Sequence, residues 1–308
     1  MRALYKRIRE DDPVSEPPIV AVVGATASGK SDLALDLAER LGGEVVNTDA
    51  MAIYRGMDIG TAKLPPDQRR GLPHHLLDLL EVHEEASVAV FQRLAREVVD
   101  DVRARGRVPV LVGGSALYTR AVVDRLDFPG TDPAVRGRLE AELAEQGAGV
   151  LHARLREADP VAAAAIEPGN GRRIVRALEV VELTGSFRAT LPEPVYLHPE
   201  TVQIGVDIDR PTLDARIERR VEQMWQAGLV EEVRGLVAPS RTASRALGYA
   251  QVLEHLAGQT SEEEAKRRTV VGTRRFARRQ DAWFRKDPRV HWVRHDDPDR
   301  LGRALHLL

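Results

Sequence analysis

The strongest chemical signal in the sequence is a glycine-rich segment followed directly by a lysine and a serine. It fits the pattern G-x-x-x-x-G-K-[ST] with Gly24, Ala25, Thr26, Ala27, Ser28, Gly29, Lys30 and Ser31. In such a loop the backbone N–H groups turn inward to phosphate oxygens, the lysine adds positive charge, and the serine can bind Mg²⁺. A helix that starts at the loop adds the positive end of its dipole. We expect these residues to bind a phosphate group; the alternative is a tight strand-to-helix turn.

Two further polar residues follow apolar segments that are typical of buried parallel strands. Asp49 follows residues 44–47, and Ser115 follows residues 108–112. Ligands of parallel α/β sheets collect at the carboxyl ends of the strands, where Gly24 also lies. We therefore expect these residues to lie close together. Their types leave other roles open, because Asp49 can be a helix N-cap or a Mg²⁺ ligand and Ser115 can be an ordinary turn residue.

The segment around Asp49 carries a resemblance to a known family. Residues 47–63 read NTDAMAIYRGMDIGTAK. Together with the phosphate loop, this string closely resembles the tRNA dimethylallyltransferases, also called tRNA isopentenyltransferases. Further matching segments, in chain order, are residues 73–78, 112–118, 132–136, 159–164, 173–179 and 245–249. The match is collinear from about Pro18 to Trp292.

The resemblance implies a fold and an activity. The fold is a P-loop NTPase-like α/β domain with a parallel sheet flanked by helices and a helical insertion domain. The activity is transfer of a dimethylallyl group from dimethylallyl diphosphate to N6 of adenosine 37, in tRNAs reading codons that begin with U. The phosphate loop would then hold a diphosphate leaving group, with Mg²⁺ as cofactor and Ser31 as its ligand.

Roles for individual residues also follow from the resemblance. Asp49 accepts a hydrogen bond from the adenine amine and takes its proton, Ser115 lies beside the reacting centre, and Arg216 lies near the diphosphate. An ion pair of Arg216 with Glu218 or Glu222 is the alternative for that arginine. The chain departs from the usual family pattern at Ala50, where many members have serine, and at Ser115, where threonine is more common.

Contacts with the anticodon stem-loop of tRNA are expected at several positions. They are Asp49, Ala50, Met51, Ala52, Arg136, Arg172, Arg173, Arg176, Arg245, Arg275 and Arg279. The last two belong to a basic segment, Lys266 to Arg289, with ten Lys/Arg against two Asp, a balance of 10 − 2 = +8. As a helix it would place its cations opposite a packed apolar side that includes Trp283. A charge run is usually a solvated face, but the lack of balancing acids here favours contact with RNA phosphates.

The elements that must position these residues alternate at first and are then helical. Strands are expected at 19–23, 44–47, 108–112, 202–206 and 290–293, with helices between them, which predicts a parallel sheet covered on both faces. Residues 127–200 contain helical segments alone. We expect a flexible extension at 1–16, a catalytic core of 17–126 and 201–308, and an insertion of 127–200 that contacts tRNA. Ser261 and Glu264 are expected to form a capping box.

Composition restricts the possible functions. Of 308 residues 43% are hydrophobic and 30% are charged, which is ordinary for a globular protein, and no segment is apolar enough to cross a membrane. The absence of cysteine excludes disulfides and thiol chemistry and favours a cytoplasmic location. The adjacent pair His74 and His75 does not have the spacing of a zinc site. We expect a monomer; the alternative function is a P-loop small-molecule kinase.

Overall fold

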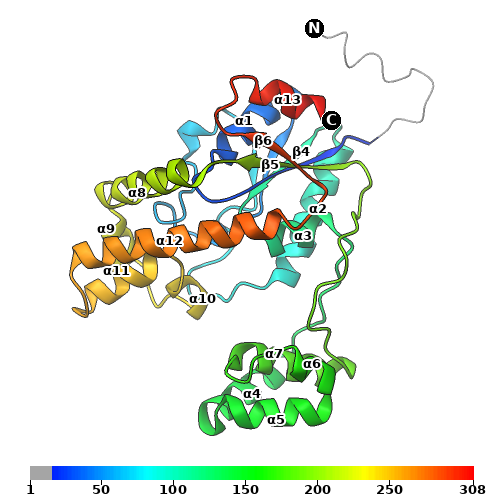
Figure 1. Cartoon of the computed structure of the whole chain (residues 1–308), viewed down its shortest axis with the longest axis vertical. Helices are drawn as coiled ribbons and strands as arrows, with labels where there is room; N and C mark the ends of the chain where they lie inside the picture. The colour runs from blue at the N-terminus through cyan, green and yellow to red at the C-terminus, as the bar shows by residue number, and fades with distance from the viewer. Residues whose placement is uncertain (1–15) are drawn as a thin grey trace. The chain divides into compact units, whose positions relative to one another are not determined.

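A computed structural model describes residues 16–308 of the chain; the expected extension, 1–16, lies outside these residues except for Glu16. The chain divides into two compact units (Figure 1). The first combines the chain up to Asp124 with Tyr196–Leu308, and the second is Arg125–Val195. No helix among the described residues is long and apolar enough to cross a membrane.

The first unit is built on a six-stranded sheet in which all paired strands are parallel. The strands are β1 (Ile19–Val23), β2 (Glu44–Asn47), β3 (His74–His75), β4 (Pro109–Gly113), β5 (Thr201–Asp207) and β6 (Val290–Arg294). Their order across the sheet is β3-β2-β4-β1-β5-β6. Every expected strand is present within about two residues. The short β3, which contains the histidine pair, was not expected to be a strand.

Helices cover both faces of this sheet (Figure 1). They are α1 (Lys30–Leu41), α2 (Val88–Ala104), α3 (Ala116–Val123), α8 (Arg210–Gln226), α9 (Leu229–Arg234), α10 (Arg241–Ser244), α11 (Tyr249–Leu256), α12 (Glu262–Phe284) and α13 (Arg300–His306), with a short 3₁₀ turn at Pro66–Gln68. Helices α1 and α13 share one core with the sheet, and the longer helices α2, α8 and α12 share the other.

The residues of β1 show why the sheet is covered on both sides. Ile19, Ala21 and Val23 belong to one core, whereas Val20 and Val22 belong to the other. Successive side chains of a strand point to opposite faces, so a strand of apolar residues alone needs a partner layer on each side. The sheet therefore buries its middle and leaves the carboxyl ends of its strands for ligands.

The second unit consists of four helices around a separate core. They are α4 (Pro133–Gln146), α5 (Ala148–Ala158), α6 (Pro160–Ala164) and α7 (Gly171–Thr184). Asp132 and Asp159 cap α4 and α6 through their side chains, and a proline follows each of them at the first helical position. Leucines and isoleucine from these helices are buried together in one cluster: Leu139, Leu151, Leu155, Ile174 and Leu178.

The bounds of the second unit differ from the expected 127–200. The two connecting segments pair with each other, because Asp124 forms an antiparallel bridge with Tyr196 and the N–H of Leu197 donates to the carbonyl of Val123 at 2.8 Å. Residues 196–200 thus belong to the first unit. This pairing joins residues that lie about seventy positions apart, which no local sequence pattern reveals.

Candidate active site

The glycine-rich segment 24–31 forms the turn between β1 and α1. Helix α1 begins at Lys30, and its N-cap Gly29 has a φ of 95°, a left-handed conformation that favours glycine. The first N–H groups of a helix have no partner within it, so the start of α1 offers donors and a positive dipole end to an anion. The N–H groups of the loop were expected to point to phosphate oxygens. The N–H of Thr26 instead donates to Oε1 of Gln280 at 2.8 Å.

Three cationic side chains converge on this loop. Lys30 belongs to it, and Arg216 and Arg220 reach it from α8. Arg216 donates to the carbonyl of Ser28 at 3.2 Å, and Arg220 donates to the hydroxyl of Thr26 at 3.3 Å. Within residues 16–308 none of the three cations forms an ion pair with a carboxylate, so the alternative ion pairs of Arg216 within its own helix are not formed.

Burial perturbs two of these cations. Desolvation lowers the pKa of the Lys30 ammonium to about 8, while the carboxylate of Asp49 acts to raise it and the guanidinium of Arg220 lowers it further. Burial likewise lowers the pKa of Arg220, against the opposing effect of Asp32. Partly buried cations that form no ion pair with a carboxylate are unfavourable. The loop is therefore electrostatically suited to an anionic ligand.

Asp49 and Ser115 come together at the carboxyl ends of β2 and β4. The N–H of Ala50 donates to Oγ of Ser115 at 3.1 Å, which leaves the hydroxyl proton of Ser115 as a donor. One carboxylate oxygen of Asp49 accepts from the N–H of Met51 at 2.9 Å. No helix among the described residues begins at Asp49, so the N-cap alternative is wrong. Because β4 lies between β2 and β1, Ser115 is next to the phosphate loop that starts at Gly24, and Asp49 lies one strand further away, close enough to act on the charge of Lys30.

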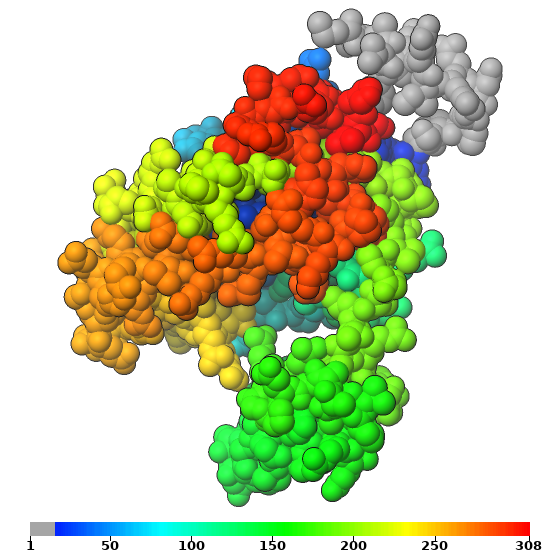
Figure 2. All heavy atoms as spheres, viewed as in Figure 1, coloured from blue at the N-terminus to red at the C-terminus, as the bar shows by residue number. Residues whose placement is uncertain are grey.

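A cavity of about 450 Å³ opens at this edge of the sheet. Figure 2 shows a hollow between α8 and α12, with dark blue atoms of the N-terminal part of the chain at its bottom. The polar lining comprises Thr26, Asp49, Thr61, Ser115, Arg220, Thr242, Arg245, Thr269, Thr273 and Arg279. The apolar lining includes Ile217, Val221, Met224, Leu247, Tyr249 and Phe276. One cavity thus offers an anion site, a carboxylate and a surface for a hydrocarbon or a nucleobase.

Other residues of the expected site fall in different places. Ala50 and Met51 line the cavity, and Arg245 also lines it while being exposed to solvent. Ala52 is buried, 6% exposed, and does not line the cavity. Ser31 is exposed at the start of α1.

A half-buried carboxylate acts as a latch that holds one wall of the cavity in place. Glu232 of α9 accepts hydrogen bonds from three successive N–H groups, those of residues 58–60, at 2.7–3.2 Å. The hydroxyl of Tyr249 donates to the same carboxylate at 2.5 Å. Gly60 is required here, because a Cβ would lie 2.4 Å from the ring of Tyr249. Glu232 therefore fixes the backbone on which Gly60, Thr61 and Ala62 line the cavity.

Helix α12 carries the expected basic face, but the expected lack of balancing acids is wrong. Carboxylates pair with most cations of the segment 266–289, which extends past the end of α12: Lys266–Glu222, Arg267–Glu264, Arg268–Glu254, Arg274–Glu218, Arg278–Asp214, Arg285–Asp207 and Arg289–Asp287. Several of these acids lie on α8, far away in the sequence. In the described part of the chain Arg275, Arg279 and Lys286 form no ion pair and are exposed. These three residues are the free basic face.

Two smaller expectations for α12 also differ from the structure. The hydroxyl of Ser261 accepts the N–H of Glu264 at 3.2 Å, but the carboxylate of Glu264 binds Arg267 instead of completing a capping box. Trp283, expected on the packed side, is 42% exposed. The helix therefore presents an indole as well as free cations to solvent.

In the second unit a buried carboxylate binds two of the arginines that were expected to contact tRNA. Glu179 is fully buried and forms ion pairs with Arg136 and Arg176. Burial acts to raise the pKa of Glu179, but the hydrogen bonds from both arginines outweigh it and hold that pKa below its usual value. The guanidinium of Arg173 is bound to the carbonyl of Ala189, and Arg172 is exposed. Arg136 and Arg176 thus stabilise the unit itself.

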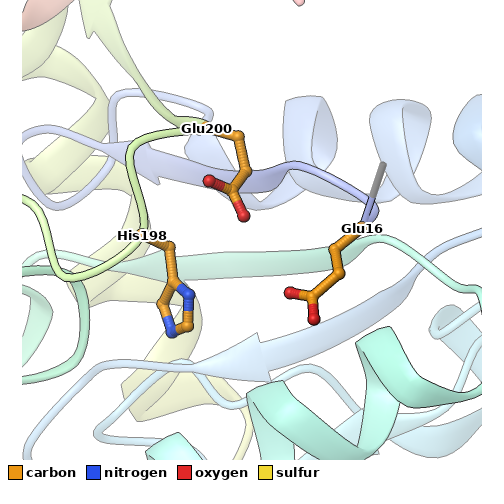
Figure 3. A group of neighbouring side chains, drawn as sticks. All are labelled: Glu16, His198 and Glu200. Atoms are coloured by element: carbon orange, nitrogen blue, oxygen red, sulfur yellow. The ribbon is translucent and has the colours of Figure 1, made fainter. Parts of the chain in front are cut away.

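One group of side chains elsewhere has the residue types of a metal site. Glu16, His198 and Glu200 point toward one another (Figure 3), with ligand atoms within 4.8 Å. The guanidinium of Arg103 lies among them: it is 2.8 Å from Glu16 and 2.8 Å from Nδ1 of His198, and it also pairs with Glu200. A buried cation already neutralises these carboxylates. We therefore assign this group a structural role.

Sequence reasoning missed several residues of the site. The i, i+4 spacing of Arg216 and Arg220 placed both on one helix face, which was a usable signal for Arg220. Gln280 and Glu232 gave no such signal, because their partners in the phosphate loop and in residues 58–60 lie 254 and 172–174 positions away.

Comparisons with known proteins show which proteins this chain is similar to. Residues 52–287 match the family model described as "IPP transferase". The chain is 64% identical to the tRNA dimethylallyltransferase of a Nocardioides species, over 94% of this chain and 96% of the relative. It is 62% identical to the enzyme of the same name from Thermobifida fusca, over 94% of both chains.

Solved structures show the same fold. A full-length tRNA isopentenylpyrophosphate transferase from Bacillus halodurans is 40% identical and superimposes with a TM-score of 0.68, over 95% of this chain and 94% of that one. A eukaryotic dimethylallyltransferase acting on tRNA is 25% identical with a TM-score of 0.78, over 92% of this chain and 75% of that one. The expected P-loop NTPase-like fold is thereby confirmed, and the chain belongs to the tRNA dimethylallyltransferase family.

Proposed function

We propose that the protein transfers the dimethylallyl group of dimethylallyl diphosphate to N6 of adenosine 37 in tRNAs that read codons beginning with U. The observation that carries the proposal is the single cavity at the carboxyl ends of β1, β2 and β4. It joins the phosphate loop, the carboxylate of Asp49 and the hydroxyl of Ser115 to an apolar lining. An allylic diphosphate needs both an anion site and an apolar surface, and the acceptor amine needs a proton acceptor.

The phosphate loop is proposed to stabilise the leaving group. When diphosphate leaves an allylic carbon, negative charge grows on its oxygens. Fixed N–H donors and cations at that position lower the barrier, because they need no reorganisation during the reaction. Lys30, Arg216 and Arg220 lie at the loop without carboxylate partners, so their charge is available to the diphosphate.

Mg²⁺ fits this loop as an ion that arrives with the diphosphate. Magnesium in phosphate sites is usually held by one or two protein ligands, phosphate oxygens and water. Ser31 offers an exposed hydroxyl beside the loop, and the loop has no cluster of three carboxylate or histidine ligands among the described residues. Ser31 would hold the ion, and the bound ion would neutralise charge on the diphosphate.

Asp49 is proposed as the general base. The lone pair of an adenine amine is delocalised into the ring, so the amine is a poor nucleophile. A carboxylate that accepts one of its N–H bonds orients the amine and takes the proton as the new bond forms. Asp49 lines the cavity, and within the described chain its second oxygen has no hydrogen-bond partner. The hydroxyl of Ser115 is proposed to contact the reacting groups next to it.

The anticodon stem-loop is proposed to bind to the free basic face of α12 together with Arg245. Arg245 and Arg279 line the cavity, so cations reach its mouth. Arg172 and Arg173 of the second unit are proposed to add contacts with the tRNA backbone. Extrusion of the target adenine from its stack would bring N6 to Asp49. We further propose a cytoplasmic monomer.

The test is incubation of the protein with labelled dimethylallyl diphosphate, unmodified tRNA and Mg²⁺, followed by nucleoside analysis. We expect labelled dimethylallyladenosine. A parallel incubation with labelled ATP and a panel of small metabolites tests the kinase alternative. Metabolite-dependent ATP turnover without labelled tRNA would refute the proposal.

A further inference from the structure

A glutamine on α12 connects two backbone segments of the active site. Gln280 is 5% exposed, and both ends of its amide are used. Its Oε1 accepts the N–H of Thr26 at 2.8 Å, and its Nε2 donates to the carbonyl of Gly114 at 2.9 Å. The orientation of the amide is thereby determined, because the reverse orientation would oppose two donors and two acceptors.

The two segments lie on opposite sides of the proposed reaction. Thr26 belongs to the phosphate loop, which holds the leaving group. Gly114 precedes Ser115, whose hydroxyl receives the N–H next to Asp49. A Cβ at Gly114 would lie 2.2 Å from Nε2 of Gln280. Only glycine lets the amide approach this backbone so closely.

Gln280 also belongs to the helix that carries the free basic face. Arg279 is its neighbour in sequence and lines the cavity, and Arg275 is exposed further along α12. The same helix therefore presents cations to solvent and a buried amide to the phosphate loop.

We propose that Gln280 is a positioning residue for the transfer reaction: its amide sets the distance between the phosphate loop and the Ser115 end of β4, and so aligns the allylic carbon with the acceptor amine. This inference rests on the proposed function. Alignment of two reactants contributes much of the rate of a bimolecular step, and a misplacement of about 1 Å can cost roughly 100-fold.

The test compares two variants of Gln280 with a matched control in the full-length protein. Gln280→Met keeps the volume and removes both hydrogen bonds. Gln280→Glu keeps the acceptor for Thr26 but opposes a second oxygen to the carbonyl of Gly114. Gln203→Met is the control, since Gln203 is also a buried glutamine, 2% exposed, and bridges Tyr196 and Asp287 away from the cavity. Thermal unfolding is measured for all variants.

We expect Gln280→Met to lower the single-turnover rate at saturating substrates by roughly 10- to 100-fold, with the dissociation constant for tRNA changed less than about threefold. Amide hydrogen exchange at Thr26 should become faster. Gln203→Met should lose stability with a normal rate. In Gln280→Glu the rate relative to wild type should recover as the pH falls, because the protonated carboxyl restores both hydrogen bonds and burial raises its pKa.

The outcomes separate this inference from the proposed function. If the wild-type protein does not label tRNA, the proposed function fails. If the wild type labels tRNA and folded Gln280→Met reacts at the wild-type rate, the inference is overturned. It is also overturned if Gln203→Met and Gln280→Met lose rate in proportion to their loss of stability, or if Gln280→Glu shows no recovery at low pH.

Discussion

At the scale of single residues, the site depends on charged side chains that do not form the ion pairs usual for their residue types. Asp49 has one oxygen engaged by the N–H of Met51, and within the described chain the other has no partner. Lys30 and Arg220 are partly buried and, within the described residues, form no ion pair with a carboxylate. These groups are poised for two substrates, one that is anionic and one that donates N–H groups.

Asp49→Asn should test the role of the carboxylate. The amide keeps the shape and an acceptor oxygen but cannot take a proton. Single-turnover transfer should fall by about 10²- to 10⁴-fold, while both substrates bind within a few-fold of wild type. If Asp49 instead holds Mg²⁺, the defect will lie in diphosphate affinity and will be rescued by a higher Mg²⁺ concentration.

Diphosphate binding should depend on pH through Lys30. The pKa of Lys30 in the free protein is about 8, and a bound diphosphate favours the protonated ammonium. Affinity should therefore be constant below pH 8 and fall by up to about tenfold per pH unit above it. Calorimetric titrations from pH 6.5 to 9.5 measure this dependence.

Lys30→Arg is the control for the pH dependence, because a guanidinium stays charged throughout this range. Its affinity profile above pH 8 should be flat. An equally steep loss of affinity in wild type and Lys30→Arg would show that another group titrates.

Local sequence patterns predicted the site residues that lie directly after an expected strand. The phosphate loop and Asp49 follow strands that the apolar pattern of the sequence indicates, and their proximity to Ser115 follows from a parallel sheet. Gln280 and Arg220 act through contacts with residues 254 and 194 positions away. A pairing at that separation is set by the packing of α8 and α12 on the sheet, which a single sequence does not specify.

At the scale of elements, α12 shows that packing against other helices decides which cations of a basic segment are paired. The segment has few acids of its own, but α8 places Asp214, Glu218 and Glu222 beside it. Arg274 and Arg278 therefore stabilise the helix pair, Arg267 and Arg268 pair with Glu264 and Glu254, and Arg275, Arg279 and Lys286 are left for a partner. The sequence predicted the helix and named Arg275 and Arg279 for tRNA contact, but it could not show that the other arginines are paired.

Reversing charge on the free basic face should weaken tRNA binding. Arg275→Glu with Arg279→Glu should lower tRNA affinity with little effect on dimethylallyl diphosphate affinity. The slope of log affinity against log salt should become shallower by roughly 0.7–0.9 per lost phosphate contact. Binding titrations at several salt concentrations measure it.

The matched control reverses two paired cations of the same helix. Arg267→Glu with Arg268→Glu makes the same change in charge, at residues bound to Glu264 and Glu254. Its salt slope should stay near that of wild type. Equal slopes for the two double variants would mean that the free basic face has no special role.

The latch on residues 58–60 should contribute stability. Glu232→Gln replaces an acceptor oxygen with an NH₂ group that opposes backbone N–H donors, which should cost about 1–3 kcal/mol of unfolding free energy. Glu231→Gln is the control, since Glu231 is exposed and pairs with Arg234, and it should change stability by less than about 0.5 kcal/mol. Urea denaturation measures the free energy of unfolding of both variants. Similar small losses of stability in both would show that Glu232 does not hold residues 58–60 in place.

At the scale of the whole molecule, the chain combines two units with separate cores. The first contains the sheet, the cavity and the free basic face; the second is a small helical unit with its own buried cluster. The change from alternating elements to helices alone predicted this division. The end of the insertion was placed five residues late, at 200 instead of 195, because the pairing of the connecting segments is a long-range contact.

The most direct test of the account uses two tRNA transcripts that differ only at position 37. One carries adenosine and the other guanosine, and each is incubated with labelled dimethylallyl diphosphate and Mg²⁺ under single-turnover conditions. The account predicts stoichiometric label in the adenosine transcript, recovered as N6-(dimethylallyl)adenosine, and none in the guanosine transcript. Equal labelling of both transcripts, or no labelling of either, would contradict it.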